Sequence, residues 1–286
     1  MAEELEIKLS VSADHQQAAV AWLLGRAEAS DGACKRLANR YYDTPSGELN
    51  RQRVALRVRQ AGGQNIQTLK TQGEFVDGAH RRQEWEWPLM GTELNIGLVA
   101  DTPVGQGVNL AELKPVFETN FERQVIMINE GDTAIEVAVD TGSIVAGSRE
   151  RPLHEIEFEL KSGDPSRLVR WARALAAQVP VFLNLVSKAE QGYYLAGIHQ
   201  PHAVTGSSPL SVPEFLHQLS VYWLLESPVN FPGPALENLR QAAAQAGVEG
   251  RWQKLESEIL GGHTVQGLID NVPRLGELQL VLASSN

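Results

Sequence analysis

Close to its start the chain contains the stretch Glu4-Leu5-Glu6-Ile7-Lys8-Leu9, in which charged and apolar residues alternate without a break. Successive side chains of a β-strand point to opposite faces, so the charged residues share one face and the apolar residues share the other. Two carboxylates followed by an amine could hold a divalent cation at one end of that face and an anion at the other. A half-buried strand with its polar side in water has the same pattern, so this stretch alone leaves both interpretations open.

The same alternation returns along the first two thirds of the chain and predicts an antiparallel sheet. We expect strands at 40–43, 54–59, 66–70, 82–87, 121–128, 134–140, 143–146 and 153–160. Gly62-Gly63 indicates a hairpin, and Thr141-Gly142 is typical of a turn between two of these strands. About eight short strands joined by tight turns are enough for a sheet to close into a barrel.

Helices are expected beside the sheet and after it. Ser12 is typical of the N-cap of a helix over 14–27, and Asp164-Pro165 is typical of the start of a helix over 165–178. Residues 201–213 are rich in Gly, Ser, Pro and His, which indicates a linker, and residues 214–286 have helical apolar stripes. We therefore predict an α+β fold with a domain over 1–200, a linker over 201–213 and a small helical region over 214–286.

Charged residues are sorted by sign among the predicted strands. Acidic residues dominate 4–6, 84–86 and 155–159, whereas other strands supply the bases Arg57, Arg59, Lys70, Arg82 and Arg123. A sheet that faces water should interleave opposite charges, because like charges directly opposite each other are destabilising. Rows of like charge suit the inside of a barrel, where a metal ion would neutralise the carboxylates and a polyphosphate would neutralise the bases.

Composition limits the classes of function. The 286-residue chain has a net charge of -10, which argues against a general nucleic-acid binder but not against a small polyanion in a local basic cluster. Cys34 is the only cysteine, so the chain has no intramolecular disulfide and no cysteine-based zinc site. The first residues lack the pattern of a signal peptide, and no apolar run approaches the roughly 20 residues that span a membrane. We therefore expect a cytoplasmic protein without nucleic-acid or membrane partners.

The ordered set of motifs resembles the CYTH superfamily, the triphosphate tunnel metalloenzymes. The ExExK signature of that superfamily is matched by Glu4, Glu6 and Lys8. The similarity continues through YYDTP at 41–45, LRVR at 56–59, TLK at 68–70, RQE at 82–84, FER at 121–123, VDTG at 139–142, EIEFEL at 155–160 and SKAEQGY at 187–193. It covers residues 1 to about 200 and implies an eight-stranded antiparallel β-barrel that encloses a tunnel, with flanking helices.

The resemblance also implies a role for each matching residue. The metal ligands would be Glu4, Glu6, Asp140, Glu155 and Glu157, whose hard oxygens suit Mg²⁺ or Mn²⁺. Glu159 lies on the same row of the strand and could hold a second metal ion or its water. The triphosphate would be held by Lys8, Arg57, Arg59, Lys70, Arg82, Arg123 and Lys188. Glu4, Glu6 and Lys8 would take part in catalysis, and Glu84 would orient one of the bases.

Several functions are compatible with this resemblance. The first is metal-dependent hydrolysis of inorganic triphosphate, a small polyphosphate substrate, to pyrophosphate and phosphate. The alternatives are hydrolysis of an organic triphosphate, such as thiamine triphosphate or a nucleotide, and a class IV adenylyl cyclase activity. A non-catalytic polyphosphate or nucleotide sensor belongs to a different class of function, and the completeness of the predicted metal site disfavours it.

The C-terminal region differs from the module that long bacterial members of the superfamily carry after the barrel, a basic helical CHAD domain. From Glu214 onward this chain has four basic and eight acidic residues. We therefore expect the region to pack against the barrel or to form a homodimer, and not to bind polyphosphate.

Overall fold

The computed structural model describes residues 2–71, 73–76, 78–203 and 206–284, and it leaves the side chains at positions 2, 3 and 82 undescribed. Within these residues the strands are β1 (Ala2–Ser10), β2 (Ala29–Asp43), β3 (Ala55–Ala61), β4 (Gln64–Lys70), β5 (Glu74–Val76), β6 (Ala79–Leu89), β7 (Lys114–Glu130), β8 (Thr133–Ala146), β9 (Arg149–Ser162) and β10 (Phe182–Leu183).

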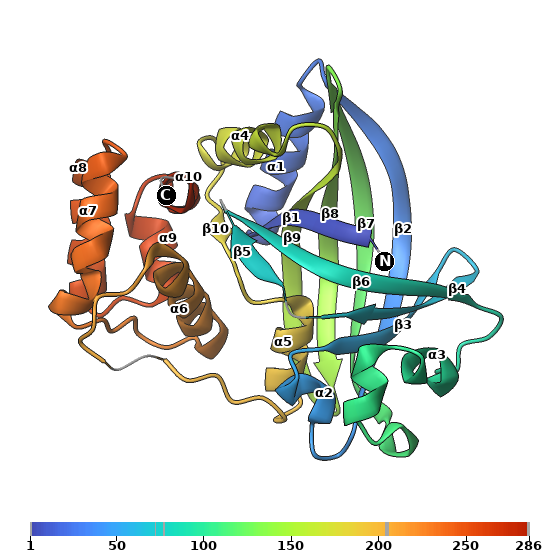
Figure 1. Ribbon diagram of the computed structural model, residues 1–286. Helices are drawn as coiled ribbons and strands as arrows, with labels where there is room; N and C mark the ends of the chain where they lie inside the picture. The colour runs from blue at the N-terminus through green and yellow to red at the C-terminus, as the bar shows by residue number, and fades with distance from the viewer. Residues whose placement is uncertain (1, 72, 77, 204–205, 285–286) are drawn as a thin grey trace.

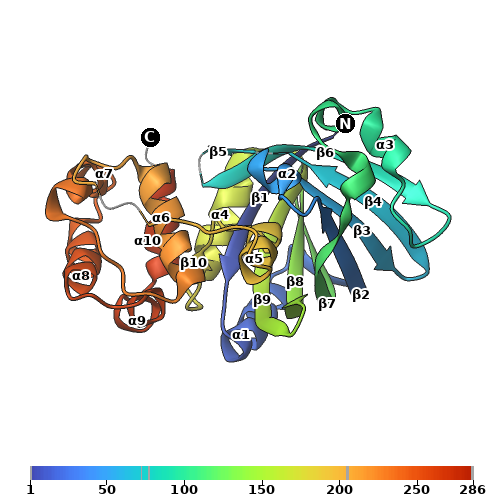
Figure 2. The same cartoon turned by 90° about the horizontal axis from the view of Figure 1, so that it is seen from below.

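The strands form one antiparallel sheet that curls around and closes (Figures 1 and 2). β1 is hydrogen-bonded to β9 along one edge and to β6 along the other. Among the described residues, eight strands thus complete a ring in the order β1-β9-β8-β7-β2-β3-β4-β6, while β5 and β10 extend it at its edges. This ring confirms the predicted eight-stranded antiparallel barrel of an α+β fold.

The helices are α1 (Ala13–Leu24), α2 (Glu48–Arg51), α3 (Ile96–Ala100), α4 (Pro165–Ala176), α5 (Lys188–Leu195), α6 (Val212–Leu225), α7 (Glu237–Gln245), α8 (Glu249–Leu260), α9 (Val265–Asn271) and α10 (Leu275–Ala283), with the 3-10 helices η1 (Pro103–Gly107), η2 (Leu110–Glu112) and η3 (Gly233–Leu236). Ser12 caps α1 by accepting a hydrogen bond from the backbone N–H of His15, and Asp164 caps α4 in the same way. Among the described residues, no helix has both the length and the apolar character needed to cross a membrane.

The alternation in β1 separates the outer core of the barrel from its interior. Ile7 and Leu9 are fully buried in the hydrophobic core outside the sheet, whereas Glu6 and Lys8 line the interior cavity. The charged rows therefore point inward and the apolar rows point outward, as the sorting of charges predicts.

The same outer core continues into the C-terminal helices, which lie beside the barrel in Figure 1. Arg151 of β9 donates to the carbonyl oxygen of Leu224 at 3.0 Å, and its guanidinium lies 4.5 Å from the ring centre of Trp223. The backbone N–H of Leu185 donates to the hydroxyl of Ser220 at 2.9 Å. These contacts fix α6 against the barrel.

Residues 133–146 form one strand, which corrects the turn expected at Thr141-Gly142. β8 pairs with both β7 and β9 through these two residues. A Cβ added at Gly142 would lie 2.1 Å from the carbonyl oxygen of Asn120. The glycine is therefore required by the close approach of β7 and not by a turn.

Candidate active site

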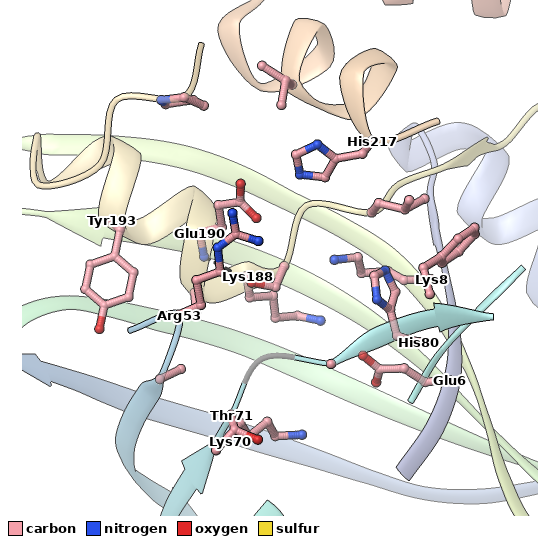
Figure 3. Close-up of a pocket in the computed structure, with 18 of the residues that line it drawn as sticks. Glu6, Lys8, Arg53, Lys70, Thr71, His80, Lys188, Glu190, Tyr193 and His217 are labelled. Carbon is pink, nitrogen blue, oxygen red and sulfur yellow. Dashed lines mark hydrogen bonds between the residues drawn. The ribbon is translucent and has the colours of Figure 1, made fainter. Parts of the chain in front are cut away.

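The barrel encloses a cavity of about 1260 Å³ that brings most of the predicted site residues together. Residues of β1, β3, β4, β6, β7, β8 and β9 line it, and α5 and α6 contribute further side chains. Figure 3 shows Glu6, Lys8, Lys70 and Lys188 facing one space, with His217 of α6 across from them. The C-terminal helical region thus forms part of the cavity wall.

Lys188 of α5 holds three carboxylates together at one side of the cavity. Its Nζ lies 2.7 Å from Glu155, 2.7 Å from Glu157 and 2.9 Å from Asp140. Arg123 of β7 makes two hydrogen bonds of 2.7 Å to Asp140 and one of 2.7 Å to Glu157. Asp140 and Glu155 lie directly opposite each other and are buried, so this pair of like charges depends on the two cations.

The pKa values of this cluster follow from burial and charge. Burial alone would lower the pKa of Lys188, but the three carboxylates raise it well above its usual value. Burial alone would raise the pKa of Glu157, but Lys188 and Arg123 hold it well below its usual value. Burial also opposes the charged form of Arg123, and Asp140 outweighs that effect and raises the pKa of Arg123. Lys188, Arg123 and Glu157 are therefore charged at neutral pH.

A second group of ion pairs centres on Lys70 of β4. Its Nζ lies 2.9 Å from Glu4 and 3.1 Å from Glu84. Glu84 also lies 3.9 Å from Arg57. Glu84 is therefore placed between two of the predicted substrate-binding bases, which fits the orienting role expected for it.

Lys8 is buried on β1 and donates a hydrogen bond to the carbonyl oxygen of Val186. Burial is the main cause that lowers the pKa of Lys8, and the carboxylates of Glu155, Glu6 and Glu157 oppose it. An anion bound beside this ammonium would offset the cost of burying its charge.

Three carboxylates lie side by side across β1, β9 and β8. Glu6 is opposite Glu159, Glu159 is opposite Glu136, and all three line the cavity. Lys161 of β9 places its Nζ 2.7 Å from Glu159 and 3.6 Å from Glu136. Burial raises the pKa of Glu159, and the carboxylates of Glu4 and Glu136 act in the same direction against the hydrogen bond from Lys161. Lys161 thus supplies positive charge to Glu159 and Glu136.

Positive charge is crowded on the facing side of the barrel. Burial lowers the pKa of Arg59 to about 9, with Arg57 and Arg123 as further causes, while its Nε donates to Asn39 at 2.7 Å. Burial alone would raise the pKa of Tyr41, but Arg57 and Arg59 hold it below its usual value. A guanidinium stays protonated at neutral pH, so the shift of Arg59 reports a repulsion that a bound anion would relieve.

All but one of the predicted site residues lie in the cavity or directly behind its wall, and the side chain of the remaining one is not described by the structure. Asp140 and Glu155 lie behind the wall, where they contact Lys188. The side chain of Arg82 is outside the described part of the chain, although its backbone pairs with Glu4. All the others line the cavity, namely Glu4, Glu6, Lys8, Arg57, Arg59, Lys70, Arg123, Glu157, Glu159 and Lys188.

Sequence reasoning missed four residues that face the same cavity. Glu136 precedes Asp140 by four positions on β8, and Lys161 continues the inward row of β9, so the period of two could have revealed both. Tyr41 belongs to the YYDTP motif but not to the predicted site residues, and it lines the cavity beside the arginines. His217 has no local signal, because its place depends on how α6 docks on the barrel.

The carboxylates suit a hard divalent cation, yet they are turned toward basic side chains. Within the described residues, no three Asp, Glu, His or Cys side chains converge in a metal-binding arrangement. Lysine ammonium groups instead lie beside five of the six predicted ligands: Lys70 next to Glu4, Lys161 next to Glu159, and Lys188 next to Asp140, Glu155 and Glu157. An oxygen-only donor set that already attracts cations fits Mg²⁺ or Mn²⁺.

Comparison with known proteins identifies the family of this chain. The inorganic triphosphatase of Haemophilus influenzae is 39% identical over 161 residues, which are 56% of this chain and 46% of that protein, so the match spans about half of its length. A solved structure from Hippeastrum, described as an adenylyl cyclase candidate with a dominant triphosphatase activity, is 18% identical. It has a TM-score of 0.51 over 69% of this chain and 98% of its own, and it shares the fold. The model of the CYTH domain matches residues 2–193, and the chain therefore belongs to the CYTH family.

Proposed function

We propose that this protein hydrolyses inorganic triphosphate to pyrophosphate and phosphate inside the barrel, with a divalent cation as cofactor. The observation that carries the proposal is the cavity itself, which basic and acidic side chains line together. The name of the Haemophilus influenzae relative, an inorganic triphosphatase, supports this choice of substrate.

The basic residues account for substrate binding. Arg57, Arg59, Lys70, Arg123 and Lys188 come from four elements, β3, β4, β7 and α5, and line the cavity, so they can contact several phosphoryl oxygens of one short polyanion. Arginine can bind phosphate through two parallel hydrogen bonds, and lysine acts as a point charge. Lys8 adds an ammonium from β1, the strand that carries the first two carboxylates.

The carboxylates account for cofactor binding. Glu4, Glu6, Asp140, Glu155, Glu157 and Glu159 would hold Mg²⁺ or Mn²⁺ through their oxygens. When bound, such a cation draws charge from the phosphoryl oxygens and makes a water molecule more acidic.

Hydrolysis needs a water oxygen to attack the terminal phosphorus while the bond to the pyrophosphate oxygen breaks. Glu4 or Glu6 would take the proton of the attacking water, and the surrounding bases would stabilise the charge that moves onto the leaving pyrophosphate. Pyrophosphate in a cationic pocket is a stable leaving group, so the step does not require a strong general acid. Electrostatic stabilisation by the basic residues is thus the main contribution of the protein.

Phosphate release from tripolyphosphate, ATP and thiamine triphosphate tests the proposal when it is measured with Mg²⁺, with Mn²⁺ and with chelator. We expect fast release from tripolyphosphate that chelator abolishes. The organic substrates belong in the comparison because the cavity of about 1260 Å³ exceeds the roughly 1,000 Å³ of a large ligand site. Faster release from an organic triphosphate would change the substrate, and triphosphate binding without release would indicate a sensor.

Two variants connect this activity to the site. Glu6→Gln should abolish cation-dependent release, and Arg59→Ala should lower the rate on tripolyphosphate by roughly tenfold or more, since each removes a charge that faces the cavity. Arg40→Ala is the matched control, because Arg40 is exposed and pairs with Glu118 away from the cavity. Unchanged turnover in either site variant would remove that residue from the mechanism.

A further inference from the structure

Lys161 contacts two of the three neighbouring carboxylates on β1, β9 and β8, and its own side chain stays partly exposed to solvent. Its Nζ lies 2.7 Å from Glu159 and 3.6 Å from Glu136, and its side chain is 38% exposed. It is the second-last residue of β9, and Gly163 follows that strand. The ammonium reaches the cavity from the edge of the barrel and can turn outward without a change in the sheet.

Glu159 and Glu136 face each other across β9 and β8 and need a positive charge at this position. Glu6, Glu159 and Glu136 are directly opposite one another on three neighbouring strands. Like charges in such positions repel each other, and Glu159 and Glu136 are each only 26% exposed, so water screens the repulsion in part. Lys161 supplies one positive charge to these carboxylates.

Lys188, in the same barrel, is a buried counter-cation for its carboxylates. Its side chain is 9% exposed and contacts three carboxylates within 2.9 Å. Lys161 has one short and one long contact and is partly in solvent, where an ion pair contributes little stability. Of these two lysines, Lys161 is therefore the one that a bound ion can replace.

We propose that Lys161 is an internal counter-cation that neutralises Glu159 and Glu136 in the cation-free protein and competes with the divalent cation for them. The inference rests on the proposed function, because it takes Glu159 as a ligand of that cation. Binding of the cation turns Lys161 outward, which lowers the apparent affinity and makes the oxygens of Glu136 available as well.

Titration of the full-length protein with Mn²⁺ in a calorimeter, without substrate, tests this proposal. We expect Lys161→Met to bind Mn²⁺ about three- to fivefold more tightly than the wild type, since the cation then no longer has to break a partly exposed ion pair. Lys161→Arg keeps the charge and should stay within about twofold of the wild type, on the same electrostatic argument. Lys254→Met removes the same charge from α8, outside the barrel, and controls for the change in net charge.

Tighter binding distinguishes the proposed role of Lys161 from damage to the site, because damage would weaken the binding of Mn²⁺. If the wild type binds Mn²⁺ and Lys161→Met binds it no more tightly, the counter-cation role is wrong and the proposed cation site stands. If neither protein binds Mn²⁺, the proposed cation site fails, and this inference fails with it.

Discussion

Lys188 neutralises three carboxylates that would otherwise repel one another inside the barrel. Its pKa is raised and the pKa of Glu157 is lowered, so both groups favour their charged forms in the folded protein. The Lys188 charge stabilises the fold at every pH below about 10.5, and the Glu157 charge does so above about 4.5, their ordinary pKa values. Between these limits the cluster contributes its full stabilisation.

Lys188→Met should therefore lower the free energy of unfolding by about 3–5 kcal/mol at neutral pH, because it leaves carboxylates buried without a partner. The difference from the wild type should shrink as the pH falls toward about 4.5, since the unpaired carboxylates then take up protons. Urea unfolding of both proteins across this pH range measures the effect. Lys35→Met, on an exposed position of β2, is the control, and a loss as small as that control would contradict the prediction.

At the residue scale, the sequence predicts much of the candidate site and misses the parts that depend on pairing. Glu4, Glu6 and Lys8 follow from strict alternation, and the ordered motifs supply the remaining predicted residues. Glu136 and Lys161 belong to no quoted motif, and their importance appears only when the register places them beside Glu159. Register is a property of two strands, and a pattern within one strand does not contain it.

At the scale of elements, one side chain ties α1 to the strands behind the carboxylates. Gln16 is 5% exposed and donates to the backbone carbonyl oxygen of Asp140 at 2.8 Å. Its amide oxygen accepts from the hydroxyl of Thr141 at 2.8 Å and lies 3.1 Å from Nδ1 of His154. The amide thus clamps β8 and β9 at the level where Asp140 and Glu155 face inward.

Gln16→Met keeps the length of this side chain and removes its hydrogen bonds. It should cost about 1–3 kcal/mol of unfolding free energy, since it leaves buried polar groups without their partner. Gln17→Met, on the exposed neighbouring position of α1, is the matched control and should change stability by less than about 0.5 kcal/mol. Equal stability of the two variants in urea would show that the clamp is dispensable.

The strands were easier to predict than their ends and connections. β2 begins at Ala29, well before the predicted start at residue 40. The prediction missed this part of the strand because residues 29–36 are largely exposed and have no apolar alternation. In the sequence, Gly142 resembles a turn residue. The structure shows that a glycine is needed there because β7, some 20 positions earlier in the chain, passes too close for a side chain. Local sequence patterns predict well which residues are buried, whereas close approaches between strands can be seen only in the tertiary structure.

At the scale of the whole molecule, the barrel and the C-terminal helices share one hydrophobic core. The core runs from Ile7 and Phe158 of the barrel through Trp171 of α4 to Phe215 of α6 and Leu278 of α10. Figure 2 shows α6 and α10 between the barrel and the other C-terminal helices. The division into 1–200, 201–213 and 214–286 stays a prediction, as does a homodimer.

Because the core is shared, we expect one cooperative unfolding transition for the whole chain in differential scanning calorimetry. A chain that ends at residue 200 should aggregate, because its outer apolar face would lose the cover of α6 and α10. Two separate transitions, or a soluble and folded fragment over 1–200, would contradict this expectation. The fragment is best compared with the full chain under identical buffer conditions.

The pairing of β1 has a consequence for synthesis on the ribosome. β1 leaves the ribosome well before several of its partners, since one of its edges pairs with residues 155–159 and its end pairs with Phe182 and Leu183. Such large sequence separations slow folding, and an open edge with alternating apolar residues is prone to wrong pairing. The strand that supplies the first two carboxylates must therefore stay unpaired along that edge until residues 155–159 have been made, which makes the nascent chain a natural client for chaperones.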